Sequence, residues 1–177
     1  DRFAFAVSRF GNVQRVVEMD AHVADAALGE GIAIRPSSVL RVPNTTDAHR
    51  LIMLASESGV APAPLIEMLF TAHFIEGLDL GDRAVLAAIG ARSGLDPEAV
   101  RRHLDGTADI AGLRQADRAA RRAGIHAVPC FVFDGRYAIS GAQDPVAFLP
   151  LVELIGIEAL AARPSRQVDE VALRRVR

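Results

Sequence analysis

The chain has 177 residues, of which 50% are hydrophobic, and its formal charge is −2. This length and composition are typical of a globular protein with a sizeable core and exclude a disordered chain. All 20 basic side chains are arginines scattered along the sequence, so no basic patch predicts binding to nucleic acid. No apolar stretch is long enough to span a bilayer, so we expect no membrane partner.

The single cysteine, Cys130, excludes an internal disulfide framework and does not specify a compartment. Residues 1–10 lack the basic flank and apolar core of a signal peptide, and the default expectation is a cytoplasmic protein. Because Asp1 cannot start translation, we expect a preceding segment in the longer protein. His22, His73 and His103 are isolated, and none pairs with a cysteine or an acid at metal-ligand spacing, so we predict no metal site.

Apolar residues at helical spacing predict a first helix over 10–31, followed by an extended connector over 32–43. Asn44 is predicted to cap the next helix, with Asp47 three positions later in the acidic role of a capping box. That helix is expected to end at Ser58-Gly59.

Four more helices are predicted to follow. One covers 62–75, and a second, capped by an aspartate, covers 82–94. A third begins at Asp96-Pro97, where a cap precedes a proline in the first turn. The fourth covers 107–122 and has a strongly charged outer surface.

The pattern then changes from helix to strand. A loop ending in a buried proline leads into an apolar β run at 130–133, and a second run covers 136–140. Asp134-Gly135 between the runs is a strong hairpin signal. A lone hairpin cannot bury both of its faces, so we expect further strands of the same sheet in the preceding segment.

The last predicted helix opens at Asp144-Pro145 and continues to about residue 155. The polar and basic residues 163–177 are typical of a frayed tail or a loose helix.

Two stretches together resemble a known family. Residues 41–51 read Arg-Val-Pro-Asn-Thr-Thr-Asp-Ala-His-Arg-Leu, and 124–144 contain Val-Pro-Cys-Phe and Tyr-Ala-Ile-Ser-Gly-Ala-Gln. They resemble the DsbA-like thioredoxin family over roughly 10–155. The closest branch is the FrnE-type oxidoreductases, which are related to 2-hydroxychromene-2-carboxylate isomerases and kappa-class glutathione transferases.

The resemblance implies an α/β, thioredoxin-like fold of DsbA type with a large all-helical insertion. The family's N-terminal strand-helix-strand unit and its Cys-x-x-Cys pair are not among these residues, so the chain would be mostly α with a C-terminal β-hairpin. Residues 1–123 would form the mainly helical insertion, 124–160 the C-terminal part of the thioredoxin-like domain, and 161–177 a tail.

The resemblance assigns a substrate platform to Val128 and Pro129. Pro129 would be the family's cis-proline, and the backbone of Val128 would pair with an extended substrate like an added strand. From the residues alone, Pro129 reads as an ordinary trans proline that begins an edge strand. His126 could raise the thiolate fraction of a nearby sulfur when charged, or it could be an exposed loop histidine.

Other candidate site residues also have two interpretations. Asn44 is most simply a helix cap, and the resemblance also lets it line the substrate cleft. Gly141 and Gln143 belong to a turn that helps hold glutathione in the glutathione-using relatives, or to a plain loop. Cys130 is interpreted as a packing residue, and the alternative is a thiol that forms mixed disulfides beside the platform.

The function that the resemblance implies is thiol-disulfide exchange with protein or small-molecule thiols and disulfides. No cofactor is expected, although glutathione could be a co-substrate. One alternative is a glutathione-dependent isomerase or transferase of the 2-hydroxychromene-2-carboxylate isomerase type. Another is a non-catalytic, truncated binding module. An open hairpin edge also makes a homodimer an expected possibility.

Overall fold

The structure is a computed structural model that describes residues 1–161. It divides into two compact units, Asp1–Asp117 and a second that begins at Arg118. Each unit is described by itself. The part of the predicted tail beyond residue 161 lies outside the described residues.

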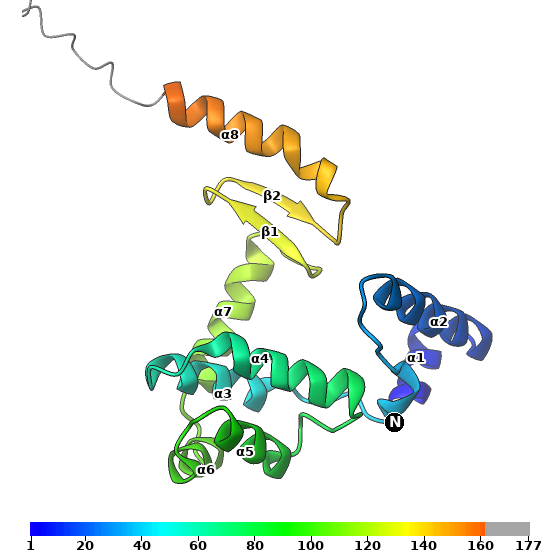
Figure 1. The fold of residues 1–177 in the computed structure, drawn as a ribbon, viewed down its shortest axis with the longest axis vertical. Coiled ribbons are helices and arrows are strands. Elements are labelled where there is room, and N and C mark those ends of the chain that lie inside the picture. Colours follow the sequence, from blue (N-terminus) through cyan, green and yellow to red (C-terminus); the bar gives the residue numbers. More distant parts are fainter. Residues whose placement is uncertain (162–177) are drawn as a thin grey trace, which may run out of the picture. The chain divides into compact units, whose positions relative to one another are not determined.

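The first unit is built from helices (Figure 1). They are α1 (Arg2–Phe10), α2 (Val13–Gly29), α3 (Thr46–Glu57), α4 (Pro62–Phe70), α5 (Arg83–Arg92), α6 (Pro97–Asp105) and α7 (Ile110–Arg122), with a short 3-10 helix η1 (Pro36–Ser38) and a π-helix η2 (Thr71–Ile75). The last of them, α7, continues into the second unit. None of the helices in residues 1–161 is long and apolar enough to cross a bilayer.

The start of the chain differs from the single helix expected over 10–31. The expected helix is present as α2, which begins at Val13, and a further helix that was not predicted, α1, precedes it and ends at Gly11, whose φ is +102°. Asn12 then caps α2, because its side chain accepts a hydrogen bond from the Arg15 amide. The predicted start was three residues too early, because the left-handed Gly11 and the cap at Asn12 separate α2 from the helix before it.

The start of α3 also corrects a prediction. The N-cap is Thr45, and the Asn44 side chain accepts from the Thr46 amide at 3.0 Å, just ahead of the helix. Asp47 does not close a capping box, because its carboxylate binds Arg50 and Arg83 instead. Both donors are charged guanidinium groups, so donor and acceptor are ionised in each of these two hydrogen bonds.

Several predicted boundaries are confirmed further along. The helix over 62–75 appears as α4 continued by η2, and both aspartate caps, Asp82 before α5 and Asp96 before α6, accept backbone hydrogen bonds. These caps were predictable because capping bonds reach only two or three residues along the chain.

The core of the first unit lies among α3, α4, α5 and α6. Its members are apolar side chains with little or no exposed surface, namely Leu51, Ala55, Leu65, Leu69, Leu86, Ile89, Val100 and Leu104. Gly90 lets α5 approach its neighbours, because a Cβ there would lie 3.0 Å from Val100 Cγ2 and 3.2 Å from Leu51 Cδ1. Close helix packing at this point therefore depends on the missing side chain.

One buried charge, Arg50, closes the end of α6. Its guanidinium has no exposed surface and donates to Asp47 and to the main-chain carbonyls of His103, Leu104, Gly106 and Ala108. The last carbonyls of a helix have no partner within the helix, so this side chain satisfies them. Its bonds to Gly106 and Ala108 lie in the segment between α6 and α7, where Asp109 has a φ of +66°, and α7 begins at Ile110 instead of the predicted residue 107.

The second unit contains the predicted hairpin. Strand β1 (Cys130–Phe133) pairs antiparallel with β2 (Tyr137–Ser140), with Cys130 opposite Ser140 and Phe133 opposite Tyr137. Asp134 and Gly135 both have positive φ, as the turn between such strands requires.

The last helix begins at the predicted cap and runs further than expected. Asp144 accepts from the Val146 amide, a 3-10 helix η3 (Pro145–Phe148) follows, and α8 covers Leu149–Ala161. The first turn stays 3-10 because Pro150 has no N–H to donate to the carbonyl four residues before it.

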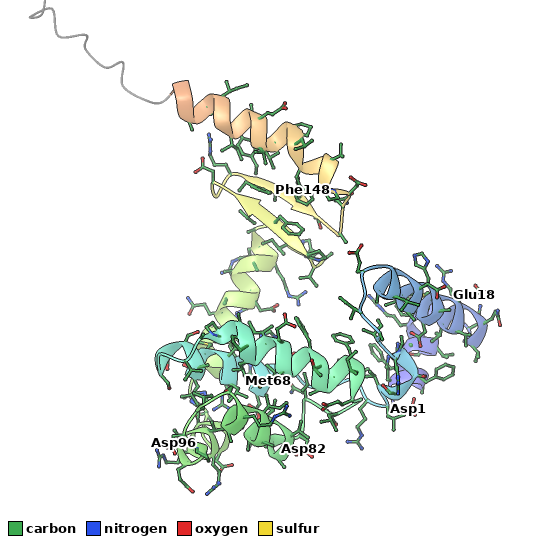
Figure 2. The ribbon with its side chains drawn as sticks, viewed as in Figure 1. Asp1, Glu18, Met68, Asp82, Asp96 and Phe148 are labelled. Atoms are coloured by element: carbon green, nitrogen blue, oxygen red, sulfur yellow. The ribbon has the colours of Figure 1, made fainter. Side chains whose placement is uncertain are left out.

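Helix α8 lies over one face of the hairpin (Figure 1). At its start the Phe148 ring, labelled in Figure 2, packs edge-on against Phe131 with centroids 5.0 Å apart and also approaches Phe133. Toward its other end, Glu158 accepts hydrogen bonds from Tyr137 and Arg136 of the hairpin. One sheet face is thus held at both ends of the helix.

Candidate substrate platform at the entry of strand β1

The predicted platform lies where the loop after α7 enters β1. The Val128–Pro129 peptide bond is cis, and the Val128 side chain points away from the fold, with the residue 87% exposed. Pro129 is exposed too, so the expected buried proline was wrong. Pro129 precedes β1 and lies ahead of Phe131 and Phe133, the two side chains that Phe148 packs against.

The main chain beside this point is open. Within residues 1–161 the sheet has two strands, so β1 pairs with β2 along one edge and with no strand along the other. Val128 makes no hydrogen bond through its backbone in this part of the chain. An unpaired strand edge can accept an extended peptide through main-chain hydrogen bonds.

Cys130 lies directly after the platform and is half-buried. It is opposite Ser140, and the alternation along β1 places it on the sheet face away from Phe131. No ion pair or hydrogen bond joins it to a charged group among the described residues. Its assignment as a packing residue therefore remains a prediction.

His126 is exposed, and it makes no hydrogen bond or ion pair within the described part of the chain. Its suggested effect on a nearby sulfur also remains a prediction. No group of three side chains that could hold a metal ion occurs in residues 1–161.

The turn after β2 is fastened to the platform. The Gly141 amide donates to the Pro129 carbonyl at 2.8 Å, and Gly141 adopts a φ of +86°. The Gln143 side-chain amide donates to the Ser140 carbonyl at 3.1 Å. Gly141 and Gln143, both predicted to bind substrate, therefore make hydrogen bonds that hold this turn. The structure also brings the two residues together with Pro129.

Asn44 belongs to the first unit and is exposed. It borders an open hollow of about 460 Å³ whose polar lining includes Arg41 and Asp79. The Arg41 guanidinium and the Asp79 carboxylate are 3.7 Å apart. Asn44 thus combines its hydrogen bond to the start of α3 with a place on a polar surface.

A charged cluster on the hairpin was not predicted. Tyr137 OH donates to Glu158 at 2.8 Å, Arg136 binds the other carboxylate oxygen at 2.5 Å, and the Arg136 guanidinium lies 5.1 Å from the Tyr137 ring centroid. The hydrogen bond from Tyr137, followed by that from Arg136, lowers the pKa of Glu158 below its ordinary value. The same bond raises the pKa of Tyr137. The only available sequence signal was a pair of glutamates, Glu153 and Glu158, in an otherwise apolar helix.

Comparison with known proteins identifies the family. The family described as DSBA-like thioredoxin domain matches residues 3–152. A crystal structure of a probable DsbA oxidoreductase from Streptomyces coelicolor superposes with a TM-score of 0.74 and 28% sequence identity, covering 92% of this chain and 68% of that one. No curated protein matches the chain. The expected fold, mostly helical with a C-terminal hairpin, is confirmed, and the chain belongs to the DSBA-like thioredoxin family.

Proposed function

We propose that this chain supplies the helical subdomain and the substrate-aligning platform of a FrnE-type thiol-disulfide oxidoreductase. One observation carries the proposal: Val128, just ahead of β1, is 87% exposed, and its backbone makes no hydrogen bond within the described residues, in a chain of the DSBA-like family. In this proposal, 1–123 is the helical subdomain, 124–160 completes the thioredoxin-like domain, and the protein works in the cytoplasm.

The platform aligns its substrate by main-chain pairing. An extended segment beside β1 donates to and accepts from the Val128 backbone, while the substrate side chains alternate to either side. Binding of this kind tolerates many sequences, because the main-chain groups are common to all residues. It suits an enzyme that meets cysteines in varied polypeptides.

The chemistry needs a second thiol that these 177 residues do not hold. In thiol-disulfide exchange, a thiolate attacks one sulfur of a disulfide, the other sulfur leaves as a thiolate, and a mixed disulfide forms. A second cysteine of a pair then resolves that mixed disulfide. The chain has one cysteine, so the proposal assigns the reacting pair to residues other than these and binding to Val128 and Pro129.

The turn after β2 and the start of the last helix give less support to the glutathione-dependent alternative. In that alternative the start of the last helix would suit a carboxylate of glutathione, but the Asp144 carboxylate already accepts from the Val146 amide there. A second carboxylate would be repelled by the first. We therefore expect no heat of glutathione binding to this chain in calorimetry.

The test is equilibrium binding of an extended peptide to the whole chain. Fluorescence anisotropy of labelled insulin B chain, with both cysteines alkylated, reports binding without exchange chemistry. Val128→Pro removes the N–H that the substrate would accept from and should weaken binding about tenfold. The matched control Val128→Thr keeps the N–H and the branched shape, and it should bind within about twofold.

Two results would contradict the proposal. The first is the absence of peptide binding to the unaltered chain, and the second is equal binding by Val128→Pro and Val128→Thr. An insulin-reduction assay completes the test. If the chain shows thiol-dependent turnover and Cys130→Ser abolishes it, Cys130 is a nucleophile instead of a packing residue.

Sedimentation at rising protein concentration tests the expected homodimer.

A further inference from the structure

We infer that Gly141 is a positioning residue: it fixes the carbonyl of Pro129 and thereby holds the Val128 backbone ready for an extended substrate. This inference rests on the proposed function, and it changes the role predicted for Gly141 from a substrate contact to a support. The observation behind it is the 2.8 Å hydrogen bond from the Gly141 amide to the Pro129 carbonyl.

Pro129 can be held through its main chain in only one way. Proline has no N–H, so its carbonyl is its single main-chain hydrogen-bonding group. The Gly141 amide donates a hydrogen bond to that carbonyl, one position beyond the last paired residues of the hairpin, Cys130 and Ser140. The bond therefore ties the platform to β2 at the point where the loop 124–129 enters the sheet.

The position requires glycine for a reason that is independent of packing. Gly141 has a φ of +86°, which side chains with a Cβ rarely adopt. A Cβ at this site would lie 3.4 Å from Gln143 Nε2, which is ordinary van der Waals contact. The cost of a substitution would thus come from backbone conformation, and relieving it would move the amide away from Pro129.

Gln143 reinforces the same turn. Its side-chain amide donates to the Ser140 carbonyl at 3.1 Å, which closes the turn around Gly141. The side-chain donor is therefore engaged within the protein. Gln143 acts on the platform through Gly141, and both residues belong to a support behind Val128.

The experiment compares two glycines of one hairpin. Gly135 has a φ of +64°, and a Cβ there would meet nothing within 4 Å, but it lies in the turn at the opposite end from Pro129. Gly141→Ala and Gly135→Ala thus impose a similar backbone penalty on the same hairpin. Each variant of the whole chain is measured for affinity to the alkylated insulin B chain and for thermal unfolding.

We expect both variants to lower the melting temperature and only one to lower affinity. Gly141→Ala should weaken peptide binding about tenfold, since a non-glycine residue is disfavoured in the left-handed region by an amount of that order. Gly135→Ala should bind within about twofold of the unaltered chain. Gly141→Asn should recover most of the affinity, because asparagine tolerates positive φ.

The outcomes separate this inference from the function on which it rests. Absence of binding to the unaltered chain contradicts the proposed platform itself. Binding by the unaltered chain with equal affinity losses in Gly141→Ala and Gly135→Ala overturns the inference alone, because general weakening of the hairpin would then explain both. Failure of Gly141→Asn to restore affinity would also overturn it.

Discussion

In the first unit, Leu51, Leu65 and Leu86 have no exposed surface, whereas none of residues 118–159 in the second unit is buried. The first unit encloses its own core among four helices. The second has one sheet face covered by a single helix and the other face uncovered within the described residues. Burial of apolar area is the main favourable term in folding, so the described residues of the first unit supply more of this term than those of the second.

The difference indicates how stability and function are divided. Regions with few buried contacts open at the lowest free-energy cost, and binding segments are commonly drawn from them. The open edge of β1 and the exposed Val128 lie in the unit without a closed core. The contacts that hold that unit together are the Phe148 packing and the Glu158 hydrogen bonds.

The largest expected effect is in the first unit, at Arg50. Arg50→Met would leave the Asp47 carboxylate and the carbonyls at the end of α6 without their buried partner, and we expect a loss of about 3–5 kcal/mol in the free energy of unfolding. Urea unfolding followed by far-ultraviolet circular dichroism measures it.

The matched control for Arg50 shares its carboxylate partner. Arg83 also binds Asp47, but its side chain is 53% exposed, so Arg83→Met should cost no more than about 1 kcal/mol. Equal losses in the two variants would show that the buried guanidinium does not set the stability of the first unit.

A second substitution tests close packing in the first unit. Gly77 has a φ of +71°, and a Cβ there would lie 2.5 Å from the Ser38 carbonyl oxygen, so Gly77→Ala should cost about 3 kcal/mol through strain and overlap. Gly59 has a φ of +73° with nothing within 4 Å, and Gly59→Ala should cost about 1 kcal/mol. Urea unfolding measures the loss of unfolding free energy in both variants. A larger loss for Gly59→Ala than for Gly77→Ala would contradict the close packing at Gly77.

A smaller effect is expected in the second unit. Phe148 is half-buried, so Phe148→Ala should cost about 1–2 kcal/mol, below the range for a fully buried phenylalanine. Tyr137 is the single tyrosine and the chain has no tryptophan, so tyrosine fluorescence reports on the hairpin. The fluorescence transition in urea should shift, while the circular dichroism transition, dominated by the first unit, should move little. A common shift of both transitions would show that the two units unfold together.

The smallest effect concerns pH. The pKa of Glu158 is lowered in the folded protein, so its contribution to stability is present above its unfolded pKa and is lost as pH falls through the folded value. The pKa of Tyr137 is raised, so that contribution is present below its unfolded pKa and is lost as pH rises through the folded value. Glu158→Gln should bring the phenolate titration of Tyr137 down toward its ordinary range. An unchanged titration would contradict the assigned hydrogen bond.

Local signals allowed much of the fold to be predicted. The caps at Asp82 and Asp96 and the Asp134-Gly135 hairpin were found because their hydrogen bonds and φ values involve residues within a few positions. The break at Gly11 carried a comparable local signal, a glycine followed by a capping residue, that apolar periodicity alone concealed.

The sequence by itself determined the order of the helices from α2 onward, the hairpin, and the resemblance that the family match confirms. Only the tertiary structure decided what the polar residues do. Arg50 donates to carbonyls at His103 and Ala108, which are 53 and 58 positions away, so no local pattern could assign it. Gly141 and Gln143 were given two interpretations, a ligand-holding turn or a plain loop, and the structure adds their bonds to Pro129 and Ser140 while the ligand contact stays a prediction. The physical reason is that a hydrogen-bonding group takes the partner that folding brings within reach, and that partner is fixed by packing rather than by spacing along the chain.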